Sequence, residues 1–418
     1  MNRKYFEIMA PVGSYESLMA AIQGGADSVY FGAEQLNMRA ASSNNFSLDD
    51  LRKIVSICKQ NDIKSYLTVN VVVFDHEIDQ MHRIIDAAVE SRISAVIASD
   101  LAVINYAYTS GIEVHLSTQL NITNIEALRF YSKWADVAVL ARELNLQQVN
   151  NIYKNIIEQN IRGPKGDLIK IEMFAHGALC MAVSGKCYLS LHENNKSANR
   201  GECYQTCRKS YIVTGKESGY EIEVDNEYIM SPKDLCTIGF LDKMIKAGVQ
   251  VLKIEGRARS AEYVKEVTSC YNEAIYAILD DTYNKEKTDA WTIRLSTVFN
   301  RGFWDGYYLG QTIGQWNTNY GSSATKRKVY LGKITNYFTK LNVAEIKLEN
   351  GDLNRGDVIL ITGPTTGVVE YTMEEIRVDL KIVEKALKGE LCSIKTTDFL
   401  RRSDKVYKWV DYEEISHL

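Results

Sequence analysis

Short apolar runs alternate with amphipathic stretches from the N-terminus to residue 254, and this alternation constrains the fold more than any other feature of the chain. Apolar residues at helical spacing mark residues 14–24, 51–61 and 76–91 as helices. Strands that alternate with helices in this way indicate parallel βαβ units, and eight units predict a TIM-like (β/α)8 barrel of the α/β class. The eight expected strands are residues 7–10, 28–31, 64–69, 95–97, 113–116, 137–140, 169–174 and 251–254.

A doubly wound parallel sheet is the alternative fold for such units. Sheets of that kind that bind nucleotides carry a Gly-rich phosphate-binding turn after the first strand. The turn that follows the first expected strand here is Pro11-Val12-Gly13-Ser14, which lacks that glycine pattern. The barrel is therefore the preferred prediction.

The pattern changes in the last quarter of the chain, where strand-like runs are separated by Asn-Gly, Arg-Gly-Asp and Gly-Pro turns. These runs, residues 329–338, 343–348, 358–362, 368–373 and 391–394, predict a small β-barrel domain. We therefore expect a barrel over 1–285 with an inserted cysteine-rich segment at 176–236, a connecting Gly/aromatic segment over 286–325 that packs on the barrel, and the β-barrel domain over 326–418. Lys326-Arg327-Lys328 opens that domain, either as a solvated linker or as a contact for RNA phosphates.

Charge and hydropathy restrict where the protein acts and what it binds. The net charge of −4 argues against tight non-specific binding to nucleic acid, although a local basic patch would suffice for RNA. No apolar run approaches the ~20 residues that span a bilayer. Residues 1–10 lack the basic and apolar regions of a secretory signal. We expect a cytoplasmic protein that does not enter the membrane.

Polar residues follow most of the expected strands, at the carboxyl ends where barrel active sites lie. Each of them is alternatively a strand cap or a solvated loop residue, but their shared position at one rim favours a site. The residues at this rim are Asn70, Asp100, His115, Ser117, Gln119, Asn121, Arg142, Glu143, His176, Glu255 and Arg257. Among these, we select His115, Arg142, His176, Glu255 and Arg257 as candidate catalytic residues.

Five of the eight cysteines lie between residues 180 and 236, at Cys180, Cys187, Cys203, Cys207 and Cys236. Cytosolic thiols stay reduced, so such a cluster indicates metal binding or catalysis. No CxxC pair is present, which disfavours a zinc ribbon or knuckle. Single thiolates from separate loops suit the four corners of an iron–sulfur cubane better, while zinc and incidental thiols remain alternatives.

A long stretch around these cysteines resembles the signature of the peptidase U32 family. It reads EMFAHGALCMAVSGKCYLS over residues 172–190. Further stretches are similar to the same family, so that the resemblance covers nearly the whole chain. They are APVGS at 10–14, GADSVYFG at 25–32, STQLN at 117–121, NRGEC at 199–203, SPKDLC at 231–236, KIEGR at 253–257 and NRGF at 300–303.

The resemblance implies a set of cofactors and partners. Some U32 members were described as collagenase-like proteases, and others take part in oxygen-independent hydroxylation with a four-cysteine 4Fe–4S cluster. Length and architecture are most similar to the tRNA hydroxylation members, which convert uridine 34 of the anticodon to 5-hydroxyuridine with prephenate required. Carried over by position, the cluster ligands are Cys180, Cys187, Cys203 and Cys236, and Cys207 is a fifth candidate.

Three function classes follow from these observations. The first is a cytoplasmic tRNA hydroxylase, with prephenate bound by cations such as Arg142, Arg257, Arg39 and His115, and with Glu255 or Glu172 as general base. The second is a U32-type peptidase, for which a cluster thiol paired with His176 would be the nucleophile, since HExxH and GxSxG are absent. The third is a non-catalytic subunit that acts with a paralogous partner.

Overall fold

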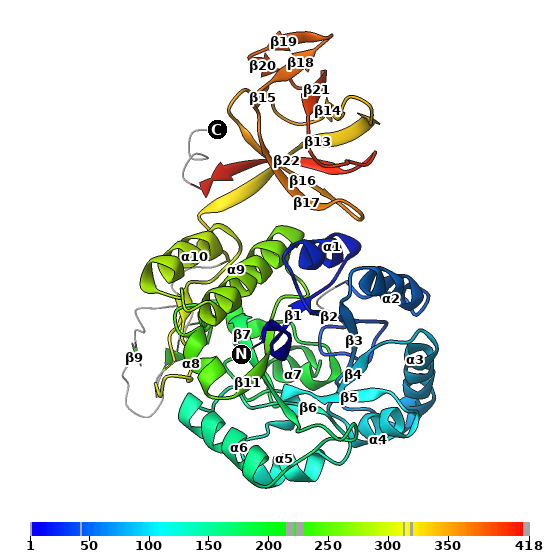
Figure 1. Ribbon diagram of the computed structural model, residues 1–418, viewed down its shortest axis with the longest axis vertical. Helices are drawn as coiled ribbons and strands as arrows, with labels where there is room; N and C mark the ends of the chain where they lie inside the picture. The colour runs from blue at the N-terminus through cyan, green and yellow to red at the C-terminus, as the bar shows by residue number, and fades with distance from the viewer. Residues whose placement is uncertain are drawn as a thin grey trace.

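Figure 1 shows the computed structural model, in which a barrel ringed by helices carries a β domain beside α1 and α9. The structure describes residues 2–41, 44–211, 213–214, 221–222, 230–311, 314–317 and 321–412. Parts of the predicted cysteine-rich and connecting segments, and the end of the predicted last domain, lie outside the described residues.

Eight parallel strands close the barrel, because the last one, β11, pairs with both β1 and β7. The predicted (β/α)8 architecture is confirmed. Its strands are β1 (Glu7–Pro11), β2 (Ser28–Gly32), β3 (Lys64–Val69), β4 (Ala95–Ala98), β5 (Glu113–Leu116), β6 (Val137–Val139), β7 (Lys170–Gly177) and β11 (Val249–Ile254).

Helices cover the outside of the barrel between successive strands, except α7, which lies over the mouth of the barrel (Figure 1). Local signals fix their starts: Ser14 and Ser17 form a capping box on α1, and Asn145 and Gln148 form one on α6. The helices are α1 (Tyr15–Gln23), α2 (Asp50–Gln60), α3 (Ile78–Glu90), α4 (Leu101–Thr109), α5 (Ile125–Tyr131), α6 (Leu146–Glu158), α7 (Leu189–Asn194), α8 (Leu241–Lys246), α9 (Ala261–Leu279) and α10 (Lys285–Thr297).

The segment after β7 adds short strands that the sequence did not predict. β8 (Val213–Thr214) and β9 (Glu221–Ile222) pair antiparallel and form a small two-stranded ribbon. β10 (Asp234–Cys236) pairs antiparallel with the end of β7, and β12 (Phe303–Trp304) pairs with β10. These pairings extend the barrel sheet beside its carboxyl rim.

The predicted C-terminal β domain is present; its strands are antiparallel, and it has its own apolar core. Its main sheet has eight strands in the order β17-β16-β22-β13-β14-β21-β18-β19. Among the described strands, no pairing joins the two edge strands, β17 and β19. The strands are β13 (Lys326–Phe338), β14 (Val343–Leu348), β15 (Leu353–Asn354), β16 (Val358–Gly363), β17 (Gly367–Thr372), β18 (Ile376–Val378), β19 (Lys381–Val383), β20 (Lys385–Ala386), β21 (Leu391–Lys395) and β22 (Lys405–Asp411).

The two parts share contacts at α1 and α9. Leu360 of β16 and Val368 of β17 belong to the same apolar cluster as the barrel helices. Gln23 at the end of α1 donates to Thr366 O and accepts from Val368 N, each at 2.9 Å. In the part of the chain that the structure describes, no helix is both long and apolar enough to cross a bilayer.

Candidate functional site

A pocket lies at the carboxyl ends of the barrel strands, covered by the cysteine-rich segment. Its floor comes from inward-facing side chains of four strands: Tyr30, Thr68, Phe174 and Lys253. Its cover includes four of the five clustered cysteines, Cys180, Cys187, Cys203 and Cys207. The predicted convergence of cysteines with the rim of the barrel is therefore present in the structure.

Two arginines hold the cysteine-bearing loops in place. Arg142 donates to Ser184 Oγ at 2.8 Å, between Cys180 and Cys187, and its guanidinium lies over the ring of Phe174. Arg208, next to Cys207 in sequence, donates to Leu179 O at 2.8 Å, next to Cys180. The same arginine donates to Ser231 Oγ and Pro232 O, so it connects three segments of the cover.

The donor set fits a cluster better than a single ion. Among the described residues, no three His, Cys, Asp or Glu side chains converge closely enough to hold one metal ion, as zinc ligands at ~2.3 Å from their metal must. A cubane separates its four ligand sulfurs more widely, at four corners. Four thiols line one pocket from separate loops, as the four ligands of a cubane would.

Burial raises the pKa of Cys207 to about 11 and that of Cys187 above its ordinary value, and the neighbouring thiols add to both effects. Arg208 acts against the shift at Cys207. Thiolates crowded into a buried site repel each other, so their ionisation needs compensating positive charge. Cationic iron would supply that charge; an isolated nucleophilic cysteine would instead need a lowered pKa.

Cys236, the fourth ligand expected from the resemblance, does not line the pocket. It lies on β10, where it pairs with His176 of β7, and its thiol lies against Tyr271 of α9. Full burial raises its pKa to about 12. The structure therefore groups Cys207, not Cys236, with the other three thiols.

Positive charge dominates the pocket. The cationic side chains that line it are Arg39, Arg142, Arg208, Lys253 and Arg257, against one carboxylate, Glu255. Glu255 accepts from Arg39 Nη2 at 2.9 Å and from Tyr30 OH at 3.1 Å. Burial opposes its ionisation, but Arg39 and Arg257 outweigh that effect and lower the pKa of the carboxyl. Glu255 is thus an ionised anchor in this structure.

Arg257 has neutral hydrogen-bond partners. Its Nη1 donates to Asn37 Oδ1 at 3.0 Å and to Thr68 Oγ1 at 2.9 Å. Burial lowers its pKa to about 10, which still leaves the guanidinium charged at neutral pH. A buried cation held by neutral groups at a pocket wall is suited to bind a carboxylate.

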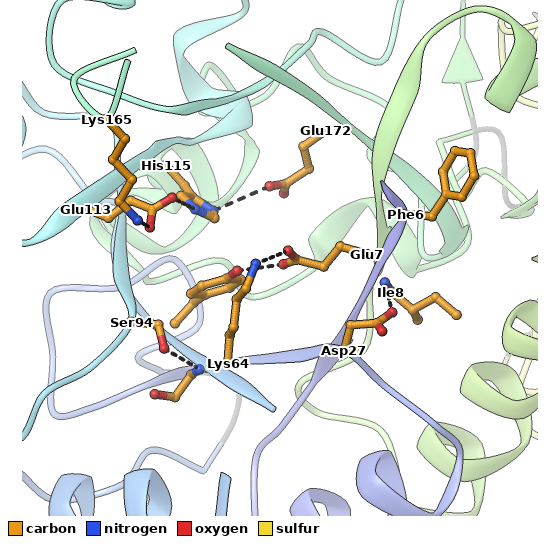
Figure 2. A network of polar contacts seen from close by, with 12 residues as sticks. Phe6, Glu7, Ile8, Asp27, Lys64, Ser94, Glu113, His115, Lys165 and Glu172 are labelled. Atoms are coloured by element: carbon orange, nitrogen blue, oxygen red, sulfur yellow. Dashed lines mark hydrogen bonds and ion pairs between the residues drawn. The ribbon is translucent and has the colours of Figure 1, made fainter. Parts of the chain in front are cut away.

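The two histidines chosen from the sequence lie outside the pocket, at 1% exposure each. His115 is the third residue of β5 and points into the barrel below the pocket floor, beside Glu113 and Glu172 (Figure 2). A β-bulge in β7 precedes His176. Lys253 of β11 pairs with Phe174, but the next residue, Ile254, pairs with His176, so one residue of β7 is skipped. The bulge reverses the alternation of sides, and His176 packs outward against Tyr263 and Tyr271 of α9.

Two charged pocket residues were missed by the sequence analysis. Lys253 interrupts the apolar run of β11, and a charge inside an expected barrel strand is a usable signal for an inward-facing functional group. Arg208 follows Cys207 directly, but nothing in its local sequence indicates the backbone carbonyls that it contacts.

The model of peptidase family U32 matches residues 13–318. A protein of Porphyromonas gingivalis named collagenase is 61% identical over 414 residues, which cover 99% of this chain and 100% of that one. A tRNA hydroxylation protein of Bacillus subtilis is 30% identical over 88% of this chain and 86% of its own. A 23S rRNA 5-hydroxycytidine synthase of Escherichia coli is 34% identical over 66% of this chain and 40% of its own.

Proposed function

Because the chain belongs to peptidase family U32, we propose that it is an iron–sulfur RNA-modifying enzyme that hydroxylates uridine 34 of tRNA without oxygen, using prephenate. The observation that carries the proposal is that four thiols line a cation-rich pocket at the carboxyl ends of the strands. The names of the tRNA- and rRNA-modifying relatives support an RNA substrate.

In this proposal, Cys180, Cys187, Cys203 and Cys207 hold a 4Fe–4S cluster. When bound, the cluster supplies electron transfer next to the substrate. Arg142 and Arg208 fix the loops that carry the thiols, and their charges favour the anionic thiolate set.

The remaining cations of the pocket would bind the co-substrate. Replacing the C5–H of the base by C5–OH is a two-electron oxidation. An oxygen donor that is itself reduced by those two electrons therefore has to lie near the base, and prephenate is proposed for that role. Its two carboxylates require two cationic partners. Arg257 at the pocket wall and Lys253 at the pocket floor are the proposed partners, and Glu255 keeps Arg39 in place beside them.

A collagenase-type peptidase is the second candidate, and the name of the P. gingivalis relative favours it. Covalent peptide hydrolysis needs a nucleophile activated by a base. No histidine is among the residues that line this pocket, and the pKa values of Cys187 and Cys207 are raised. These features favour the hydroxylase over a cysteine peptidase.

Iron content tests the ligand set. Protein purified without oxygen is expected to be brown, with about four irons per chain. Cys207→Ser should lose most of that iron, and Cys236→Ser, a matched change outside the pocket, should keep it. Iron loss in Cys236→Ser alone would overturn the assignment of Cys207, and a colourless, iron-free wild type would overturn the cluster.

Nucleoside analysis tests the reaction. Transfer RNA from a strain that lacks this gene should contain 5-hydroxyuridine only after complementation with the wild-type gene. Arg257→Ala should abolish the nucleoside while the purified variant keeps its iron, and Arg129→Ala, on the exposed face of α5, should have no effect. Unchanged tRNA, together with cleavage of gelatin by the purified protein, would favour the peptidase.

A further inference from the structure

The interior of the barrel below the pocket contains three buried or half-buried carboxylates, each paired with one lysine. Figure 2 shows the three carboxylates together with Lys64 and Lys165. Lys64 Nζ lies 2.8 Å from Glu7, and Lys253 Nζ lies 2.7 Å from Glu172. Lys165 pairs with Glu113. The three carboxylate charges are therefore already balanced by three ammonium groups.

His115 lies between two of these carboxylates. Its Nε2 is 3.2 Å from Glu113 Oε1, and its Nδ1 is 3.9 Å from Glu172 Oε2. Among the described residues, neither His115 Nδ1 nor Glu172 Oε2 has a hydrogen-bond partner, although both are fully buried. A shift of about 1 Å would bring these two atoms to hydrogen-bond distance.

With Glu113 and Glu172 both ionised, a neutral imidazole cannot satisfy this arrangement. It has one N–H and one lone pair, so whichever tautomer forms, one ring nitrogen points its lone pair at a carboxylate oxygen. The doubly protonated ring donates toward both Glu113 and Glu172. Burying that cation between two carboxylates offsets its desolvation, which would otherwise favour the neutral form.

We propose that His115 is a proton-binding site inside the barrel, an imidazolium at neutral pH that is linked through Glu172 to Lys253 at the floor of the pocket. The inference deepens the proposed function, because it names a proton-holding group one carboxylate away from the pocket that function uses. Transfer of the Nδ1 proton to Glu172 Oε2 leaves a neutral imidazole and a neutral carboxyl group, with the total charge unchanged.

Groups on every surrounding element face this site. The Tyr66 ring of β3 lies 4.5 Å from the His115 ring, and Tyr66 donates to Glu7 of β1 at 2.6 Å. The titratable groups around His115 are Glu7, Lys64, Tyr66, Glu113, Asp136, Lys165, Glu172 and Lys253.

Nitrogen-15 NMR of histidine-labelled protein tests the proposal without any enzymatic activity. His115 should show two protonated ring nitrogens at pH 7, and its signals should be assigned by their loss in His115→Gln. His82→Gln on α3, which stacks on Tyr106 far from the site, is the matched control. A single neutral tautomer of His115 at pH 7 would overturn the imidazolium.

Two further variants test the link to the pocket. Glu172→Gln should lower the proton affinity of His115 at least ten-fold, because it removes one of the two anions. Lys253→Met should raise that affinity, because it removes a nearby cation. Unchanged His115 titration in Lys253→Met would overturn the link. Since these results do not depend on iron or tRNA, failure of the inference and failure of the proposed function are distinguishable.

Discussion

At the scale of single residues, Glu113 shows how neighbours outweigh burial. Burial alone would raise its pKa, but the hydrogen bonds and charges of His115 and Lys165 lower it to about 2. An unfolded glutamate titrates near ~4.3. The folded chain therefore binds this proton more weakly, so Glu113 stabilises the fold above about pH 4.3, and that contribution is lost as the pH falls toward 2.

Glu113→Gln should consequently reduce the free energy of unfolding at pH 7 by about 1–3 kcal/mol. The difference from the wild type should shrink as the pH falls from about 5 toward 3, because the wild-type carboxylate loses its advantage there. Urea unfolding of both proteins at a series of pH values measures this difference in unfolding free energy. Glu126→Gln on α5, whose carboxylate is 71% exposed, should differ little at any pH. A difference that is constant with pH would contradict this account.

Single residues were predicted unevenly from the sequence. Spacing and resemblance identified the cysteine set, and position at the strand ends identified Arg142, Glu255 and Arg257. These residues gather at one pocket except for Cys236. The side on which Cys236 and His176 lie depends on one β-bulge and one antiparallel pairing of β7. Neither leaves a mark in the local sequence, because both are decided by partners that are distant along the chain.

At the scale of elements, the turn between β1 and α1 lies against the turn between β11 and α9. A Cβ atom added at Gly13 would lie 2.1 Å from Arg257 O, closer than any real contact. Gly13→Ala should therefore displace the turn that carries Arg257 and destabilise the protein by about 1–3 kcal/mol. The midpoint temperature of thermal unfolding should fall, and under the proposed function 5-hydroxyuridine formation should fall with it.

Gly239 provides the matched control for that change. A Cβ atom there would meet nothing within 4 Å, and its backbone is not in the left-handed region. Gly239→Ala should leave stability and activity close to the wild type. An equal loss in both variants would show that the effect is not due to the contact with Arg257.

Long elements were predictable and short ones were not. The eight barrel strands were found because short, mostly apolar runs recur at regular intervals between helices. β10 and β12, with three and two residues, are too short to show any period. β22 was missed because lysines at both Lys405 and Lys408 interrupt its apolar pattern, while its pairing with β13 and β16 places it in the middle of the sheet.

At the scale of the whole molecule, alternating side chains of two strands join two cores. On β16, Ile359 and Ile361 belong to the core of the β domain, while Leu360 between them belongs to the barrel cluster. On β17, Val368 packs with the barrel and Val369 with the β domain. The sequence shows only two continuous apolar runs here, so it indicates burial on both faces without identifying the second partner.

Gln23 offers the test of whether this contact couples the two parts. Its side chain is the partner of two buried backbone groups, Thr366 O and Val368 N. Gln23→Ala leaves both groups without that partner, which should lower the free energy of unfolding by about 1–3 kcal/mol. Calorimetry of the wild type should show one unfolding transition, and Gln23→Ala should lower its midpoint or split it in two. Gln60→Ala, at the exposed end of α2, should change neither. Two separate transitions already present in the wild type would mean that the shared apolar cluster does not make the barrel and the β domain one cooperative unit.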